Sequence, residues 1–163
     1  MGALIDILKT DQNTCKIIAK SSKLKNIYVS SKYSSALIDE YPILSIAAAC
    51  AEGEMTMKGL EELRYKESDR FSAIVDGLNK SGADVKSFKD NITIRGKIFL
   101  KGGCVVNANN DHRIAMAFNI LSLISEKPIF INGNKSIMTS FPSFFSILKE
   151  VGAKWSIHGK ENS

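Results

Sequence analysis

Two short polar clusters are the parts of the sequence best suited to chemistry. Residues 66–70 read Lys-Glu-Ser-Asp-Arg and residues 110–113 read Asn-Asp-His-Arg, and each cluster stands where a helix-like apolar pattern begins. A helix N-terminus carries about half a positive charge, so a Lys or Arg placed there costs roughly 0.3–1 kcal/mol unless an anion compensates it. Free backbone N–H groups, the helix dipole and a guanidinium together suit phosphate or carboxylate. The two clusters therefore predict a site for a small, multiply charged anion.

The first cluster supplies three candidate site residues. Lys66 and Arg70 are four positions apart, so they would share one face of a helix, and Glu67 lies three positions before Arg70. The alternative is an exposed Glu–Arg pair on a solvated surface, which is worth a few tenths of a kcal/mol. The cluster alone does not decide between these interpretations.

The second cluster favours the site. Asp111 suits an N-cap, which would place His112 and Arg113 in the first turn of the helix. A single His in that place is more often structural than catalytic. Arg113 precedes Ile-Ala-Met-Ala, whose small residues allow close packing and would hold the guanidinium in a fixed place.

A third candidate is Asp39, directly before Glu40 at another expected helix start. Asp is a favoured N-cap residue, so capping is one interpretation. The other is catalytic, because a carboxylate close to two Arg and a Lys stays ionised and can accept a hydroxyl proton.

An internal repeat indicates how these residues are positioned. Apolar spacing predicts helices over 67–81 and 140–151, related by an offset of 70 residues and each ending in Gly-Ala, at 82–83 and 152–153. The residues that match are Phe71, Ile74, Val75 and Leu78 in the first helix and Phe141, Phe144, Phe145 and Leu148 in the second. A third Gly-Ala at 2–3 precedes an apolar run over 4–8. We therefore expect the chain to begin inside a further unit whose preceding helix is absent.

The rest of each unit follows from strand and helix patterns. The first unit is predicted as strand 25–30, helix 40–51 with Pro42 in its first turn, strand 54–59, helix 67–81, and strands 83–88 and 92–96. The second is predicted as strand 104–107, helix 110–125, strand 128–132, helix 140–151 and strand 153–158. The expected fold class is α/β with repeated βαβαββ units. Helix starts near Asp39, Lys66, Asn110 and Thr139 would lie at one edge of the sheet, where ligands commonly bind.

Composition sets the broad class. The 163 residues, 44% hydrophobic and 24% charged, predict one domain over 1–163. No membrane-spanning run or secretory signal is present, so we expect a cytoplasmic protein with no membrane partner. Cys15, Cys50 and Cys104 are interpreted as small buried residues, and no metal-ligand spacing, dinucleotide fingerprint or phosphate loop is present, so neither metal nor cofactor is expected. The net charge of +5 favours a basic anion pocket over nucleic-acid binding, because basic runs with interleaved aromatic residues are lacking.

With these residues in view, the chain resembles the C-terminal part of the 5-enolpyruvylshikimate-3-phosphate synthase family from residue 1 to about residue 155. The matching strings, in order, are Ile-Asp-Glu-Tyr-Pro at 38–42, Gly-Leu-Glu-Glu-Leu-Arg-Tyr-Lys-Glu-Ser-Asp-Arg at 59–70, Asp-His-Arg-Ile-Ala-Met at 111–116 and Thr-Ser-Phe-Pro at 139–142. The resemblance implies a pseudo-threefold domain of βαβαββ units, forming most of the C-terminal half of a two-domain transferase with its active site between the domains.

The resemblance also implies an activity and roles for residues. The reaction is enolpyruvyl transfer from phosphoenolpyruvate to the 5-hydroxyl of shikimate 3-phosphate, with release of phosphate. Asp39 would bind the shikimate hydroxyls and take the proton, Lys66 would contact the 3-phosphate and help catalytic proton transfer, and Glu67 would be a candidate proton donor to the methylene carbon. Arg70 and Arg113 would bind phosphoenolpyruvate, with His112 nearby. Which acid serves which proton step stays open.

Two departures from the family pattern and three alternatives complete these expectations. Thr139 stands where many relatives have Lys, a form that resembles the glyphosate-tolerant class. The N-terminal Lys-Ser motif and the Gly-Asn-x-Gly-Thr loop have no counterpart, so the N-terminal domain is expected to be missing and the isolated chain to lack turnover. The alternatives are an enolpyruvyl transferase acting on a UDP-sugar, against which the 66–70 and 111–113 strings argue, and a non-catalytic anion-binding or nucleic-acid-binding fragment.

Overall fold

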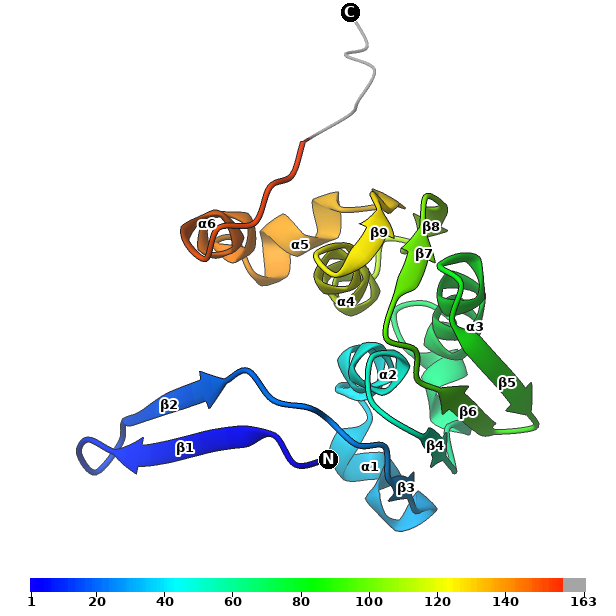
Figure 1. Cartoon of the computed structure of the whole chain (residues 1–163), viewed down its shortest axis with the longest axis horizontal. Helices are drawn as coiled ribbons and strands as arrows, with labels where there is room; N and C mark the ends of the chain where they lie inside the picture. Colours follow the sequence, from blue (N-terminus) through cyan, green and yellow to red (C-terminus); the bar gives the residue numbers. More distant parts are fainter. Residues whose placement is uncertain (157–163) are drawn as a thin grey trace, which may run out of the picture.

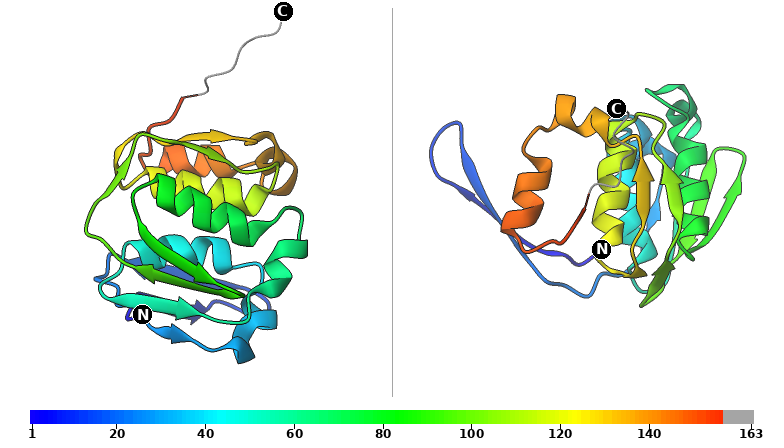
Figure 2. Two further views of the ribbon diagram at one scale, coloured as in Figure 1. Left: turned by 90° about the vertical axis from the view of Figure 1, so that its right-hand side faces the viewer. Right: turned by 90° about the horizontal axis from the view of Figure 1, so that it is seen from above.

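The structure is a computed structural model that describes residues 1–156. Three helices, α2, α3 and α4, lie beside one another and are in mutual contact (Figure 1). Their bounds are Tyr41–Ala49, Arg70–Lys80 and His112–Ser122. Strands lie on the outer side of these helices, as the two further views in Figure 2 show. These three helices form the inner layer of the fold. The candidate site residues were expected at their N-termini.

A four-stranded sheet packs against α2 and α3. In the order β3, β4, β6 and β5, its strands are Tyr28–Val29, Glu54–Met57, Asn91–Arg95 and Asp84–Phe88. β3 and β4 are parallel, with α2 between them along the chain, and the other pairs are antiparallel. Val85 lies opposite Ile94 and Ser87 lies opposite Ile92, so these side chains share one face of the sheet. Val85 is 9% exposed and both isoleucines are 0% exposed, which identifies this face as the one covered by the helices.

Two short parallel pairs and a hairpin complete the strands. β8 (Val105–Asn107) pairs with β10 (Phe130–Asn132), and β7 (Leu100–Gly102) pairs with β9 (Ser125–Lys127). β1 (Leu4–Lys9) and β2 (Cys15–Lys20) form an antiparallel hairpin that pairs with no other described strand. The remaining short helices are η1 (Ser31–Tyr33), α1 (Ser34–Leu37), η2 (Glu61–Tyr65), α5 (Lys135–Ser140) and α6 (Phe144–Glu150). The hairpin and α6 both project from the same side of the body (Figures 1 and 2).

The element order agrees with the predicted first unit. β3, α2, β4, α3, β5 and β6 follow one another as strand, helix, strand, helix, strand, strand, although β3 is much shorter than the predicted strand 25–30. The 70-residue repeat extends to backbone geometry at the two helix ends. The N–H groups of Gly82 and Ala83 donate to carbonyls three and five residues earlier, as do those of Gly152 and Ala153, and both glycines have φ +90°.

The second unit differs more from its prediction. The helix expected over 140–151 is shorter than predicted, because α6 begins only at Phe144, and the preceding helix α5, which ends at Ser140, was not predicted. Thr139 therefore lies in the last turn of α5 and does not head a helix. Strands β2, β7 and β9 were not predicted; β7 and β9 have only three residues each, and two of the six residues of β2 are lysines. The described part of the predicted strand 153–158 is not a strand, and residues 157–158 lie outside the described residues.

Close packing in the core rests partly on one glycine inside a helix. Gly77 of α3 is in direct contact with the ring of Phe118 of α4, and a Cβ added at Gly77 would overlap that ring. Phe118 is 1% exposed, so its ring is enclosed in the core. The close approach of α3 to α4 therefore depends on the missing side chain.

We expect Gly77→Ala to lower the free energy of unfolding by about 1–3 kcal/mol, because overpacking outweighs the gain of about 1 kcal/mol in helix propensity. Chemical denaturation measures the change. Asn79→Ala on the exposed side of the same helix is the matched control and is expected to be neutral or slightly stabilising. A stabilised Gly77→Ala variant would contradict the packing argument.

Two further expectations are tested by the described residues. In residues 1–156, no helix has the length and apolar character required to span a bilayer. The expectation of three buried cysteines is wrong, since Cys15 is exposed and Cys50 and Cys104 are half-buried. Cys15 lies on the projecting hairpin, whose residues Ile5, Ile7 and Ile17 are more than half exposed.

Candidate functional site

Arg70, the first residue of α3, is completely buried and is surrounded by carboxylates. Its Nε donates to Asp111 Oδ2 at 2.8 Å, its Nη1 donates to Asp39 Oδ1 at 2.7 Å, and its Nη2 lies 2.6 Å from Glu67 Oε2. These ion pairs raise the pKa of Arg70 despite its burial, which acts in the opposite direction. A guanidinium in this position is a fixed cation that holds three acids around one point.

Asp111 connects the two polar clusters. Its side chain is also fully buried, and it accepts hydrogen bonds from Arg70 and from Ser68 Oγ. As predicted, it is also the N-cap of α4, because Oδ1 accepts the backbone N–H of Arg113 at 2.9 Å. One carboxylate therefore fixes both the guanidinium of α3 and the start of α4.

Arg113 lies on the other side of Asp39. Its Nη1 donates to the backbone oxygen of Asp39 at 2.8 Å and to Glu40 Oε1 at 2.9 Å, and its Nη2 is 3.9 Å from Asp39 Oδ2. The hydrogen bond from Arg70, followed by the positive charges of Arg113 and Lys66, lowers the pKa of Asp39, although burial acts against this. Asp39 is thus ionised at neutral pH and about half exposed, as a proton acceptor that meets a ligand must be.

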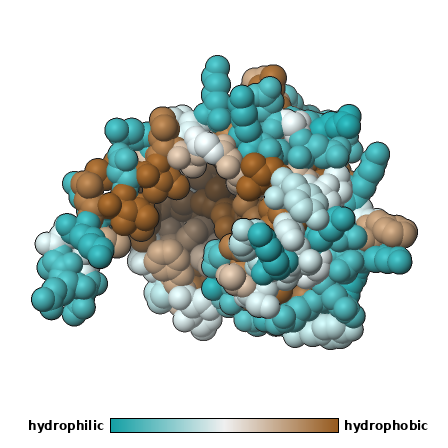
Figure 3. All heavy atoms as spheres, turned by 90° about the horizontal axis from the view of Figure 1, so that it is seen from below, coloured by the Kyte–Doolittle hydropathy of each residue, from teal (hydrophilic) through white to brown (hydrophobic). Residues whose placement is uncertain are grey.

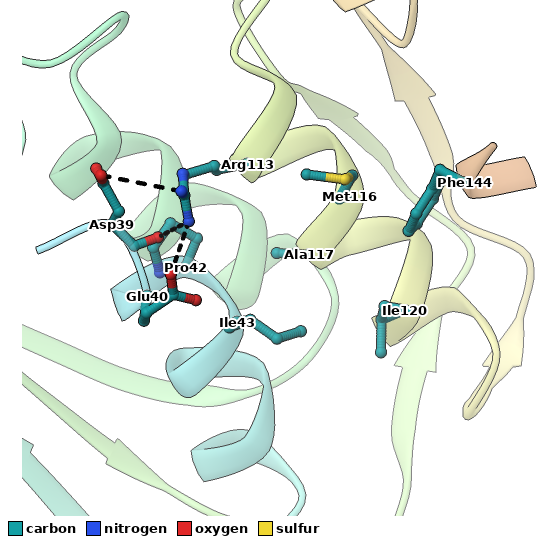
Figure 4. A pocket seen from close by; sticks show the side chains of 9 residues that line it. All are labelled: Asp39, Glu40, Pro42, Ile43, Arg113, Met116, Ala117, Ile120 and Phe144. Carbon is teal, nitrogen blue, oxygen red and sulfur yellow. Dashed lines mark hydrogen bonds and ion pairs between the residues drawn. The ribbon is translucent and has the colours of Figure 1, made fainter. Parts of the chain in front are cut away.

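The other candidates lie around this centre. Lys66 follows η2 in an extended conformation and donates to Glu62 Oε1 at 2.9 Å. Glu67 is 53% exposed, and His112 is half-buried as the first residue of α4. Figure 4 shows the pocket beside Asp39, Glu40 and Arg113, whose volume is about 200 Å³. Its far wall is apolar and includes Met116, Ile120 and Phe144.

The structure changes three local expectations. Asp39 is not a helix N-cap, since α2 begins after Glu40 and no side chain caps it. Lys66 and Glu67 precede α3, whose N-cap is Asp69, so Lys66 and Arg70 do not share a helix face. The anions that compensate the cation at the start of α3 are the protein's own carboxylates.

Four helix starts were expected to lie close together, and three of them do. Residues near the beginnings of α2, α3 and α4 meet at Asp39, Arg70 and Arg113, although they are up to 74 positions apart in the chain. The fourth, Thr139, lies at the end of α5 and donates to the backbone of its own helix.

The sequence of the chain matches a known protein family. The family model described as EPSP synthase (3-phosphoshikimate 1-carboxyvinyltransferase) matches residues 1–148. The chain belongs to the EPSP synthase family. A relative from Chelativorans sp. (strain BNC1), named 3-phosphoshikimate 1-carboxyvinyltransferase, is 44% identical over 160 residues, which cover 94% of this chain and 36% of the relative.

Solved structures agree with the fold of this EPSP synthase family member. An EPSP synthase from Acinetobacter baumannii superposes with a TM-score of 0.85 at 36% identity, over 92% of this chain and 36% of that protein. The enolpyruvyl transferase NikO from Streptomyces tendae gives a TM-score of 0.69 at 18% identity, over 94% of this chain and 33% of that one, and so shares the fold. The chain thus spans little more than a third of the length of the family members that it matches.

Sequence reasoning missed two participants of this charged cluster in the EPSP synthase family member. Asp111 was predicted only as a helix cap, and its ion pair with Arg70 spans 41 residues with no sequence signal to indicate it. Glu40 was noted only as the neighbour of Asp39, yet it binds Arg113. The position of Glu40 directly beside the candidate Asp39 was the one feature of the sequence that could have indicated its role.

The lowered pKa of Asp39 makes a prediction about stability and pH. A carboxyl whose pKa is lower in the folded state stabilises the fold above its unfolded pKa of about 4, and this contribution is lost as the pH falls through the folded value. We therefore expect the free energy of unfolding to drop more between pH 7 and pH 3 for the native chain than for Asp39→Asn. Since Asp39 is half exposed, the difference should be below about 1 kcal/mol.

Urea denaturation at the two pH values measures this difference. Asp6→Asn removes an exposed hairpin carboxylate, 3.9 Å from Lys20, and is the matched control. An Asp39→Asn variant with the same acid sensitivity as the native chain would show that the Arg70 bond does not stabilise the ionised form.

Proposed function

We propose that this chain supplies one wall of an enolpyruvyl transfer site, in a reaction that joins phosphoenolpyruvate to the 5-hydroxyl of shikimate 3-phosphate and releases phosphate. Membership of the EPSP synthase family supports the reaction class. The observation that carries the proposal is that Arg70 and Arg113, from two different helices, both contact Asp39. An ionised acid between two fixed guanidinium groups suits a reaction that removes a hydroxyl proton beside two anionic substrates.

The acids divide the proton transfers in this proposal. Asp39 takes the proton of the 5-hydroxyl, because its carboxyl is ionised at neutral pH and its side chain is accessible, although the lowered pKa weakens it as a base. Glu67 is about half exposed, and once an incoming anion displaces it from Arg70 Nη2 it takes up a proton from solvent and donates that proton to the methylene carbon of phosphoenolpyruvate. The tetrahedral adduct then loses phosphate while a proton passes from its methyl carbon back to the Glu67 carboxylate, which forms the enol ether of the product.

The cations bind the charged groups of the substrates. Arg113 is 32% exposed and borders the pocket, so it is placed to receive phosphoenolpyruvate, with His112 beside it. Lys66 contacts the 3-phosphate of shikimate 3-phosphate once it leaves the exposed carboxylate of Glu62. Arg70 binds an incoming anion only where that anion replaces Glu67 on Nη2, since its other contacts are with Asp39 and Asp111.

The chain alone is expected to lack turnover. It spans about a third of the Chelativorans relative, and we propose that the remainder of such a protein, including an N-terminal domain, supplies the opposite wall. An open site loses positioning of the two substrates and exclusion of water, which together account for much of the rate in enzymes of this kind. A cytoplasmic location without a cofactor belongs to the same proposal.

The test is phosphate release in the presence of shikimate 3-phosphate and phosphoenolpyruvate. The chain is assayed alone and after mixing with the separately expressed part of the Chelativorans relative that it does not match. Release only on mixing supports the proposal. No release in either case, together with nanomolar binding of DNA or RNA by the chain, would overturn it in favour of a nucleic-acid-binding fragment.

A further inference from the structure

Glu40 is an acid of the candidate site to which the proposed reaction assigns no role. Its Oε1 accepts a hydrogen bond of 2.9 Å from Arg113 Nη1, and Figure 4 shows the two side chains together at the edge of the pocket. Glu40 directly precedes α2, but its side chain makes no capping hydrogen bond to that helix. Among the described residues, the carboxylate of Glu40 forms an ion pair with Arg113 alone. Its role in the site is therefore to be found at Arg113.

Both N–H groups of Arg113 Nη1 are in use. One donates to the backbone oxygen of Asp39 at 2.8 Å and the other donates to Glu40 Oε1. Nη2 lies 3.9 Å from Asp39 Oδ2 and donates no hydrogen bond within the described part of the chain. An anion that binds the Nη1–Nη2 edge of a guanidinium at two points takes one N–H from each nitrogen. One of the two acceptors on Nη1 must therefore leave when such an anion binds.

Glu40 is the acceptor that can leave Nη1. The backbone oxygen of Asp39 is fixed by the chain, and the side chain of Asp39 is held by Arg70 at 2.7 Å. In contrast, the side chain of Glu40 is 55% exposed and can rotate into water. After this rotation the carboxylate still lies at the beginning of α2, where the positive end of the helix dipole favours an acid. Rotation of Glu40 therefore strands no charge in a buried place.

The charges around the pocket also favour departure of Glu40 when an anion binds. Asp39, Glu40 and Arg113 are the charged residues that line the pocket, and its other lining residues are apolar. Seen from below, the molecule is hollowed and the walls of the hollow are largely apolar as well (Figure 3). Arg113 is thus the one cation in the pocket lining, and Glu40 neutralises it. An anion in the pocket gains the full charge of Arg113 only once Glu40 has moved away.

We propose that Glu40 is an internal counter-ion of Arg113, and that the anionic substrate displaces Glu40 when it binds. This inference rests on the proposed role of Arg113 in receiving phosphoenolpyruvate, and it names the residue that tunes the affinity. The apparent dissociation constant equals the intrinsic constant divided by the fraction of molecules in which Glu40 has left Arg113. Glu40 therefore weakens binding of every anion at this position by the same factor. An anion binds well only where it makes further contacts, as the second charged group of phosphoenolpyruvate allows.

Glu40→Gln tests the proposal, because it removes the charge and keeps the size of the side chain. We expect phosphoenolpyruvate to bind the full chain about threefold to tenfold more tightly after this substitution, since an exposed ion pair no longer competes for Arg113. Titration followed by two-dimensional NMR measures weak dissociation constants and observes the Nε–H signal of Arg113 directly. Glu40→Ala removes the competing acceptor altogether and should give a gain of at least the same size.

Two controls separate displacement from other effects of charge. Glu54→Gln makes the same change in net charge at an exposed acid that lies 3.3 Å from Arg95, and it should leave the affinity for phosphoenolpyruvate unchanged. In an Arg113→Ala background, Glu40→Gln should bring no gain, because the guanidinium that Glu40 occupies is absent. The backbone NMR spectra verify that each variant remains folded.

Three outcomes would overturn the proposal. Weaker binding by Glu40→Gln would mean that Glu40 holds Arg113 in the orientation that receives the ligand. A gain that persists without Arg113 would mean that Glu40 only repels the anion through space. An unchanged affinity, or no response of Arg113 to phosphoenolpyruvate in either protein, would mean that Glu40 and the ligand do not compete.

These measurements concern binding alone and need no turnover. Phosphate release on mixing can fail while Glu40→Gln tightens binding, which would reject the proposed reaction and keep the counter-ion. Phosphate release can also succeed while Glu40→Gln leaves binding unchanged, which would reject the counter-ion alone.

Discussion

Arg70→Met is expected to lower the free energy of unfolding by about 3–5 kcal/mol, the largest stability effect of any single substitution considered for this protein. The side chain of Arg70 is 0% exposed, as is that of its partner Asp111, and the two are joined at 2.8 Å. Removing the guanidinium leaves the Asp111 carboxylate buried without its cation. Asp39 and Glu67 are about half exposed and can turn to water, so most of the loss comes from Asp111.

A double-mutant cycle isolates this pair. Asn still caps a helix well, so Asp111→Asn keeps the start of α4 while removing the buried charge. We expect Arg70→Met/Asp111→Asn to be markedly more stable than the sum of the two single substitutions implies. Chemical denaturation at neutral pH measures all four proteins.

Arg95→Met is the control for the loss of an arginine. The side chain of Arg95 is 67% exposed and lies 3.3 Å from Glu54, so its removal should cost less than about 1 kcal/mol. Similar losses for Arg70→Met and Arg95→Met would contradict the burial argument. They would mean that water reaches the acidic cluster and solvates Asp111 once the guanidinium is removed.

Arg113→Ala is expected to weaken binding of phosphoenolpyruvate by about 30-fold to 150-fold, equivalent to the roughly 2–3 kcal/mol of a charge-assisted contact. Arg113 is 32% exposed and borders the pocket, and its known contacts are with Asp39 and Glu40. Its loss should change the fold little, in contrast to that of Arg70, and should appear mainly in the KM for phosphoenolpyruvate.

The measurement needs a complete site. A chimera in which this chain replaces the matching part of the Chelativorans relative provides one, with steady-state phosphate release as the readout. Arg95→Ala is the control, because it removes an exposed arginine of β6 that pairs with Glu54 away from the cluster. An unchanged KM in the Arg113→Ala chimera would remove Arg113 from the substrate site.

The contrast between the two arginines follows from their depth in the fold. Arg70 is enclosed by acids and acts first on the protein itself, since it fixes Asp39 and Glu67 around one point. Arg113 is partly exposed and retains access to the pocket. In the proposed reaction, the inner cation therefore positions the acids and the outer cation meets the ligand.

Local patterns in the sequence determined most of the element order. The apolar period of α3, the Gly-Ala ends at 82–83 and 152–153 and the Asp111 cap depend on residues within a few positions of one another, so the chain carries them without tertiary context. Strands β7 and β9 escaped prediction because they are only three residues long and each pairs with a segment more than 20 residues away. The late start of α6, within the helix expected over 140–151, also escaped prediction, since Phe141 and Phe144 fit one helical period although the backbone turns between them.

The residue types of the site were also apparent from the sequence, whereas their partners were decided by the tertiary structure. Lys66, Arg70, Asp39 and Arg113 could be selected as charged residues at helix starts. The anions around Arg70 are Asp39, Glu67 and Asp111. They come together because three segments of the chain meet in a buried place, where low polarity makes an unpaired charge costly. Sequence spacing reports which residues can share a helix or a strand, but only packing decides which charge lies next to which.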